Sequence, residues 1–158
     1  MKTLLLLRHG KSSWKDSTLS DHDRPLKKRG RAAAAQKGQL LRELDLVPDH
    51  ILTSSAARAV ATTELAVQSA KYLGEVEIVP ALYHADPRSL VAIVSRVPAR
   101  FERVLVVGHN PGLEDWLTLL IGRRQLLSTA TLVEVQLPVD SWLDLMPDTR
   151  GTLKNIWY

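Results

Sequence analysis

The stretch Leu4-Leu5-Leu6-Leu7-Arg8-His9-Gly10 decides the fold. Four consecutive leucines are typical of a strand that is buried on both faces, as in a parallel sheet covered by helices. In such a sheet, the polar groups of a site gather beyond the carboxyl ends of the strands. We therefore expect Arg8 and His9 to lie at the mouth of a cleft, where Gly10 lets the backbone turn sharply.

A second segment has the same design. Val104–Val107 is another apolar run, and it ends in Gly108 and His109. The next two residues predict a helix, with Asn110 as its cap and Pro111 as its first residue. Two histidines at two strand ends, each beside the start of a helix, indicate a functional site rather than core packing.

Apolar periodicity, interrupted by proline and glycine, predicts further elements along the chain. Strands alternate with helices, which favours an α/β fold: a three-layer α/β/α sandwich with a mostly parallel central sheet, in one domain over residues 1–158. The strand over 131–137 alternates in polarity and is expected to be antiparallel at an edge. The other expected elements are helices over 26–44, 56–73, 87–97 and 111–121, strands over 50–53 and 76–79, and a hairpin or terminal strand within 142–158.

Composition narrows the class of protein. The 158 residues are 45% hydrophobic and 24% charged, and no apolar run is long enough to span a membrane. The leucine run is too short for a signal peptide, and the absence of cysteine fits a reducing compartment, so we expect a cytoplasmic protein that does not bind membranes. The net charge of +4 is not gathered in one long tract and no aromatics are interleaved, so nucleic acid is not expected as a partner.

Arg8, His9, Arg58 and His109 are the residues expected to carry the chemistry. Arg58 follows the sequence Thr-Ser-Ser, where a serine can cap a helix and leave the arginine in its first turn. Guanidinium groups bind phosphate with paired hydrogen bonds, and a neutral imidazole can attack phosphorus in line. Such a site needs no metal or other cofactor. A metallohydrolase built on the histidines and the loop aspartates lacks a clustered ligand motif.

Three motifs together resemble one family. The segment Leu7–Gly10, an arginine after a Thr-Ser-Ser turn, and Gly108-His109 are similar to the motifs of the histidine phosphatase, or phosphoglycerate-mutase-like, superfamily. The short chain resembles the compact SixA-type branch, the phosphohistidine phosphatases. The resemblance implies a phosphoglycerate-mutase-like fold, with His9 as the nucleophile and His109 as a phosphate ligand. It also implies that Arg24, in an Arg-Pro-Leu segment, is a third cation of the phosphate pocket.

Other parts of the site stay open at this point. Ser13 and Asn110 are candidate hydrogen-bond donors to phosphate, and Trp14 is interpreted as an anchor of its loop rather than a wall of the pocket. Larger relatives carry a glutamate after the third strand, where this chain has Leu82-Tyr83-His84-Ala85. The candidates for the general acid are therefore Asp16, Asp21, Asp23 and His84.

The missing glutamate and the short chain both bear on the substrate. A phosphoramidate relaxes the need for a general acid, because its imidazole leaves more readily than an alkoxide does. Only about 20 residues separate Leu82 from Val104, enough for one helix and no lid. We therefore expect a metal-independent phosphatase that forms a phosphohistidine intermediate and acts on phosphohistidine in a protein. The alternatives are a phosphatase of small phosphate monoesters and a phosphate-binding regulatory module without catalysis.

Overall fold

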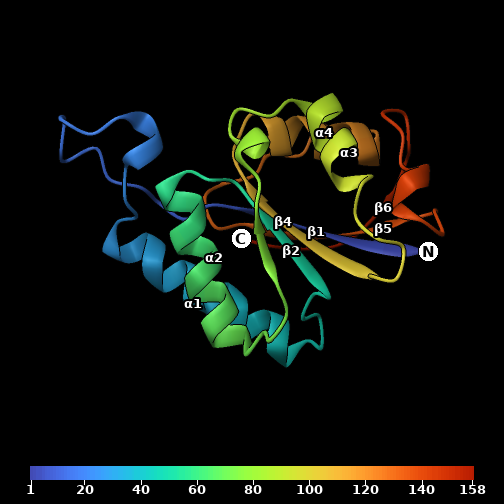
Figure 1. Ribbon diagram of the computed structural model, residues 1–158, viewed down its shortest axis with the longest axis horizontal. Helices are drawn as coiled ribbons and strands as arrows, with labels where there is room; N and C mark the ends of the chain where they lie inside the picture. The colour runs from blue at the N-terminus through green and yellow to red at the C-terminus, as the bar shows by residue number, and fades with distance from the viewer.

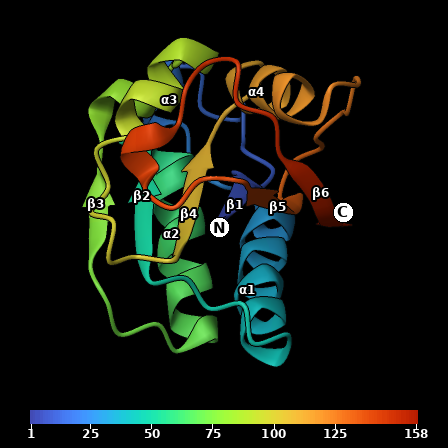
Figure 2. The same ribbon diagram turned by 90° about the vertical axis from the view of Figure 1, so that its right-hand side faces the viewer.

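The computed structural model describes all of residues 1–158, and it confirms the α/β prediction. Six strands form one sheet in the order β3-β2-β4-β1-β5-β6, and Figure 2 shows β3 and β6 at its two edges. Helices α1 and α2 cover one face, and α3 and α4 cover the other (Figure 1). The strands are β1 (Lys2–Arg8), β2 (His50–Thr53), β3 (Val76–Ile78), β4 (Arg103–Gly108), β5 (Leu132–Leu137) and β6 (Thr152–Trp157). The helices are α1 (Lys28–Glu43), α2 (Ala57–Ala70), α3 (Pro87–Val94) and α4 (Gly112–Ile121).

The leucine run forms the centre of the molecule. β1 pairs in parallel with β4 on one side and antiparallel with β5 on the other. Leu4 and Leu6 point into the core beneath α3 and α4, whereas Leu5 and Leu7 point into the core beneath α1 and α2. Side chains alternate between the faces of a strand, so an unbroken leucine run supplies both cores at once.

The parallel part of the sheet sets the position of the site. β1, β2, β3 and β4 are mutually parallel, so their carboxyl ends meet at one edge of the molecule. In Figure 1 the segment between β1 and α1 projects beyond this edge. Gly30 in α1 packs against this segment so closely that an added Cβ would lie 2.2 Å from the main-chain oxygen of Lys11. The helix and the loop after His9 therefore hold each other in place.

Some predicted boundaries are wrong. The strand over 131–137 is antiparallel, as expected, but it lies between β1 and β6, and β6 forms the edge. α1 begins at Lys28 rather than at Leu26, because Leu26 forms a β-bridge with Ser12. α2 ends at Ala70, because Lys71 adopts a left-handed conformation. None of the helices has the length and apolar character that a membrane crossing requires.

Candidate active site

A cavity of about 400 Å³ opens at the carboxyl ends of β1 and β4. It is lined by Arg8, His9 and His109, which were expected at strand ends, and by Arg58, which was expected in the first turn of a helix. The fold therefore brings these four residues into one site. The other lining residues are Lys11, Ser12, Trp14, Arg24, Lys27, Asn110 and Thr129.

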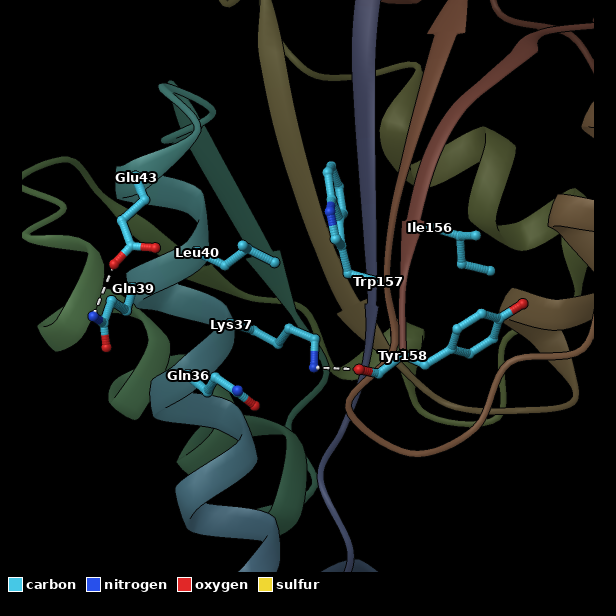
Figure 3. A pocket seen from close by; sticks show the side chains of 8 residues that line it. All are labelled: Gln36, Lys37, Gln39, Leu40, Glu43, Ile156, Trp157 and Tyr158. Atoms are coloured by element: carbon cyan, nitrogen blue, oxygen red, sulfur yellow. Dashed lines mark hydrogen bonds between the residues drawn. The ribbon is translucent and has the colours of Figure 1, made fainter.

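A larger cavity, of about 520 Å³, lies between α1 and β6 (Figure 3). Lys37 of α1 donates a 3.2 Å hydrogen bond from Nζ to the main-chain oxygen of Tyr158 across this space. Its walls contain neither histidine nor arginine. We therefore place the candidate active site in the smaller cavity, where histidines and arginines converge.

His9 is held in one orientation and one tautomer. Its Nδ1 lies 2.8 Å from the main-chain oxygen of Gly10, and only a protonated Nδ1 can donate to that acceptor. Nε2 therefore keeps its lone pair, at 3.4 Å from Nε of Arg58. Burial lowers the pKa of His9 to about 4, against the effect of the Gly10 bond, and the charges of Arg58, Arg8 and Arg24 add to the lowering. At neutral pH the imidazole is uncharged and Nε2 is nucleophilic.

His109 lies opposite His9 in the cavity, with 5.1 Å between the ring centroids. Its Nε2 is 2.7 Å from Oγ of Ser54, which follows β2. Burial, and after it His9 and the charge of Arg58, lower the pKa of His109 to about 3. Nδ1 of His109 is buried without a hydrogen-bond partner. A neutral ring with one unused nitrogen is available for a ligand in the cavity.

Arg58 lies in the first turn of α2, and Asp21 fixes its guanidinium. Nη1 donates to the main-chain oxygen of Asp21 at 2.7 Å, and Nη2 donates to its Oδ2 at 3.1 Å. The Tyr83 hydroxyl donates to the same carboxylate oxygen. This bond from Tyr83, together with Arg58 and Arg24, holds the pKa of Asp21 well below its usual range. Asp21 is therefore a carboxylate that orients Arg58, with no proton to donate as a general acid.

Two further arginines face the cavity. Arg8 donates from Nη1 to the main-chain oxygen of Leu127 at 2.9 Å. Arg24 is only 7% exposed and donates from Nη1 to Oγ of Ser12 at 2.8 Å. Arginine keeps its charge at neutral pH even when buried, so the cavity concentrates positive charge around the neutral His9. The structure thus brings Arg24 beside the other two arginines.

Ser13 and Asn110 are not placed as expected. Ser12 bridges to Leu26 in extended conformation, so the next side chain points the other way, and Oγ of Ser13 accepts a 3.1 Å hydrogen bond from the amide of Lys15 outside the cavity. Ser12 lines the cavity instead. The sequence shows a serine pair here but not which member points inward.

Asn110 lines the cavity but does not cap α4. Pro111 occupies the cap position and the helix begins at Gly112. Nδ2 of Asn110 donates to Oε2 of Glu114 at 3.1 Å and to the main-chain oxygen of Leu127 at 2.8 Å. Both amide hydrogens are therefore used within the protein. Oδ1 of Asn110 is buried without a partner.

The proposed proton donors all lie outside the cavity lining. Asp16 closes an exposed turn by accepting from Thr18, and the exposed Asp23 pairs with His22. His84 lines a separate hollow of about 140 Å³ on another side of His109. No aspartate or glutamate is among the residues that line the cavity with His9.

Trp14 is a wall of the cavity, so its interpretation as a loop anchor is wrong. Its side chain is 72% exposed, which an anchor buried under its loop would not be. Lys11, Lys27 and Thr129 also line the cavity, and the sequence did not assign them to the site. Lys11 carried a usable signal, because it follows His9 by two residues at a strand end. Lys27 carried a weaker signal, because it belongs to a basic cluster that begins at Arg24. Thr129 carried none, since only the folded loops bring it near.

Some lining residues have buried polar atoms without a hydrogen-bond partner. Five buried side-chain nitrogen or oxygen atoms have no hydrogen-bond partner, and three of them belong to Arg8, His109 and Asn110 around this cavity. Unpartnered buried polar atoms are rare, so their gathering here indicates a place for a ligand. The chain contains no cluster of three or more His, Cys, Asp or Glu residues that could hold a metal ion. The arrangement fits an anion with several oxygen atoms, bound next to a nucleophilic nitrogen.

Comparisons with known proteins agree with this geometry. The family described as the histidine phosphatase superfamily (branch 1) matches residues 4–86. An uncharacterised chloroplastic protein of Arabidopsis thaliana is 33% identical over 150 residues, which cover 89% of this chain and 69% of that protein. The chain therefore belongs to the histidine phosphatase superfamily.

Solved structures narrow the class further. A candidate phosphohistidine phosphatase SixA from Nakamurella multipartita has a TM-score of 0.87 at 26% identity, covering 99% of this chain and 95% of that one. A second candidate SixA, from Agrobacterium tumefaciens, has a TM-score of 0.83 at 25% identity, covering 99% of this chain and 98% of that one. The protein is a phosphatase of the compact, SixA-type branch.

Proposed function

We propose that the protein removes phosphate from phosphohistidine side chains of other proteins, through an intermediate in which His9 carries the phosphoryl group. One observation carries the role of His9 in this proposal. The bond from Nδ1 to Gly10 leaves the lone pair of His9 on Nε2, in a cavity lined by three arginines. A neutral imidazole is a competent nucleophile toward phosphorus, and arginines stabilise the charge that spreads over the equatorial oxygens.

The proposed reaction has two displacement steps. In the first, Nε2 of His9 forms a bond to phosphorus while the bond from phosphorus to the substrate's imidazole breaks, and that imidazole takes the bonding electrons. In the second, a water oxygen attacks the phosphorus on His9, the P–N bond breaks, and Nε2 recovers its lone pair. The water's proton remains on phosphate or passes to solvent. Arg8, Arg58 and His109 bind the phosphoryl oxygens in both steps.

The cavity lining supports phosphohistidine as the substrate. An alkoxide leaving group needs a general acid, and no carboxylic acid lines the cavity. A phosphorylated imidazole can carry a proton on its second ring nitrogen, so it leaves as neutral imidazole without an acid from the enzyme. The SixA-like structures described above are named for the same substrate class.

The access to the site supports a protein substrate. One short helix, α3, follows β3, and no inserted segment encloses the cavity. Lys11 and Lys27 lie on the rim as exposed cations, which attract the doubly negative phosphoryl group. A phosphorylated side chain on a folded partner can therefore enter the site without the movement of a lid.

The test is phosphate release from a protein that carries phosphohistidine and from an aryl phosphate, with chelator present. Wild type is compared with His9→Asn, because the asparagine Nδ2 can keep the hydrogen bond to Gly10. His50→Asn is the matched control, since it removes a buried imidazole from the opposite end of β2. We expect activity on the phosphoprotein in wild type and control, and none with His9→Asn. Activity on the aryl phosphate alone would move the substrate to small monoesters, and phosphate binding without turnover would indicate a regulatory module.

A further inference from the structure

Trp14 combines high exposure with a fixed position beside the active site. Its side chain is 72% exposed. One face of the ring is nevertheless covered, because the guanidinium carbon of Arg24 lies 3.4 Å from the ring centroid. A guanidinium stacked on indole is an attractive cation–π contact. The indole is thus ordered on one side and open to solvent on the other.

Arg24 is a firm support for the indole. It is buried, and its Nε and Nη1 donate hydrogen bonds to Oδ1 of Asp21 at 3.1 Å and to Oγ of Ser12 at 2.8 Å. Arg24 also lies near enough to His9 for its charge to lower the pKa of that imidazole. The indole therefore stands at a set position relative to the nucleophile, and a rigid aromatic side chain costs little entropy when it binds a ligand.

The composition of the cavity gives Trp14 a particular role. Of the eleven residues that line it, only one is hydrophobic, and that residue is Trp14. The phosphoryl group belongs with the arginines and histidines. The remainder of a substrate therefore meets a single flat apolar surface. Flat aromatic surfaces favour planar rings, which stack on them, over saturated groups of similar size.

We propose that Trp14 is a specificity-determining residue that stacks against a planar, unsaturated ring bearing the phosphoryl group. The proposal rests on the proposed function, because it describes the leaving group of the same reaction. Imidazole and phenol rings share the required planarity, whereas sugars and alkyl chains do not. Trp14 thereby selects phosphorylated rings by the shape of the leaving group, independently of the phosphate itself.

The test measures binding, so that it does not depend on turnover. The probes are phenylphosphonate and cyclohexylphosphonate, which carry the same anion on a flat and on a puckered six-membered ring and are not hydrolysed. Calorimetry on the full chain gives the dissociation constant of each. We expect wild type to bind the phenyl compound roughly 3- to 10-fold more tightly, the range that one aromatic stack provides. Simple burial of apolar area would favour the larger cyclohexyl ring.

Variants assign the preference to Trp14. We expect Trp14→Leu, which keeps apolar bulk without a flat face, to bind both phosphonates about equally, and Trp14→Phe to keep the preference. Leu143→Ala is the control, because it removes another exposed apolar side chain, 75% exposed, from outside the cavity. An unchanged phenyl preference in Trp14→Leu would overturn the proposal. If Trp14→Leu bound both phosphonates and inorganic phosphate more weakly by the same factor, the proposal would also be overturned, since Trp14 would then act only by holding Arg24.

Two phosphopeptides of the same sequence identify the ring, one carrying phosphohistidine and the other phosphotyrosine. We expect Trp14→Leu to raise KM for the phosphohistidine peptide by the same 3- to 10-fold and to leave kcat nearly unchanged. A rise in KM for the phosphotyrosine peptide alone would show that Trp14 stacks on phenol rings. A rise for neither would overturn the proposal. If wild type hydrolyses neither peptide but still prefers the phenyl phosphonate, the proposed function is refuted, whereas the stacking role of Trp14 is not.

Discussion

The low pKa of His9 makes the stability of the protein depend on pH. The imidazole is 6% exposed and has a pKa of about 4 when folded, against about 6.5 in an unfolded chain. Because the folded pKa is the lower one, the unfolded chain takes up the proton first as the pH falls. The stabilisation from the neutral His9 is therefore complete above pH 6.5 and is lost progressively as the pH falls toward 4.

The size of the effect follows from the difference in pKa. One pKa unit corresponds to about 1.4 kcal/mol. Full protonation of His9 therefore lowers the free energy of unfolding by about 3 kcal/mol, and a fall from pH 7.5 to pH 5 lowers it by about 2 kcal/mol. His109, with a pKa of about 3, acts in the same direction and is coupled to His9. Against a typical free energy of unfolding of about 5–15 kcal/mol, these losses are readily measured.

The assay is urea denaturation of wild type and His9→Asn at pH 7.5 and at pH 5. The variant has no titrating ring at position 9, so we expect it to lose about 2 kcal/mol less than wild type between the two values. The interval from pH 7.5 to pH 8.5, where neither histidine titrates, serves as the internal control. An equal loss in both proteins, or an NMR titration of His9 with a midpoint near 6.5, would refute the reasoning.

Three further predictions test other parts of the account. Gly30→Ala places a Cβ 2.2 Å from the main-chain oxygen of Lys11, so we expect it to lower both the melting temperature and kcat/KM. The control is Gly38→Ala, whose Cβ would lie 2.1 Å from the main-chain oxygen of Ala66, and we expect it to lower only the melting temperature. Retention of full kcat/KM by Gly30→Ala would contradict the link between α1 and the loop after the nucleophile. Arg58→Lys loses the planar fork that binds phosphate, and we expect kcat/KM to fall about 100-fold or more in steady-state assays; a fall under about 5-fold would contradict its role. Chelator should leave kcat unchanged, and restoration of lost activity by a divalent cation would show that the chemistry needs a metal.

The core of the fold and the four central residues could be predicted because they depend on local pattern. An unbroken leucine run fixes a strand buried on both faces, and parallel strands bring their carboxyl ends together. Arg8, His9 and His109 therefore had to converge once β1 and β4 were neighbours. Arg58 followed from its place in the first turn of a helix after β2.

Contacts between distant loops could not be predicted in the same way. Asp21 and Tyr83 are 62 positions apart, and nothing in either neighbourhood shows that they meet over Arg58. The choice of Ser12 over Ser13 depends on a single bridge between loop segments, which turns one side chain inward and the next one outward. The place of β5 inside the sheet depended on the final strand, whose polar, half-exposed residues carry a weak pattern.

Trapping the phosphorylated intermediate shows whether His9 is the nucleophile. Wild type is mixed with a phosphohistidine-bearing protein, quenched in alkali within a single turnover, and mapped by mass spectrometry. We expect one phosphoryl group on His9 that disappears as inorganic phosphate is released, and none with His9→Asn. Phosphate found on His109 instead, or steady turnover by His9→Asn, would contradict it.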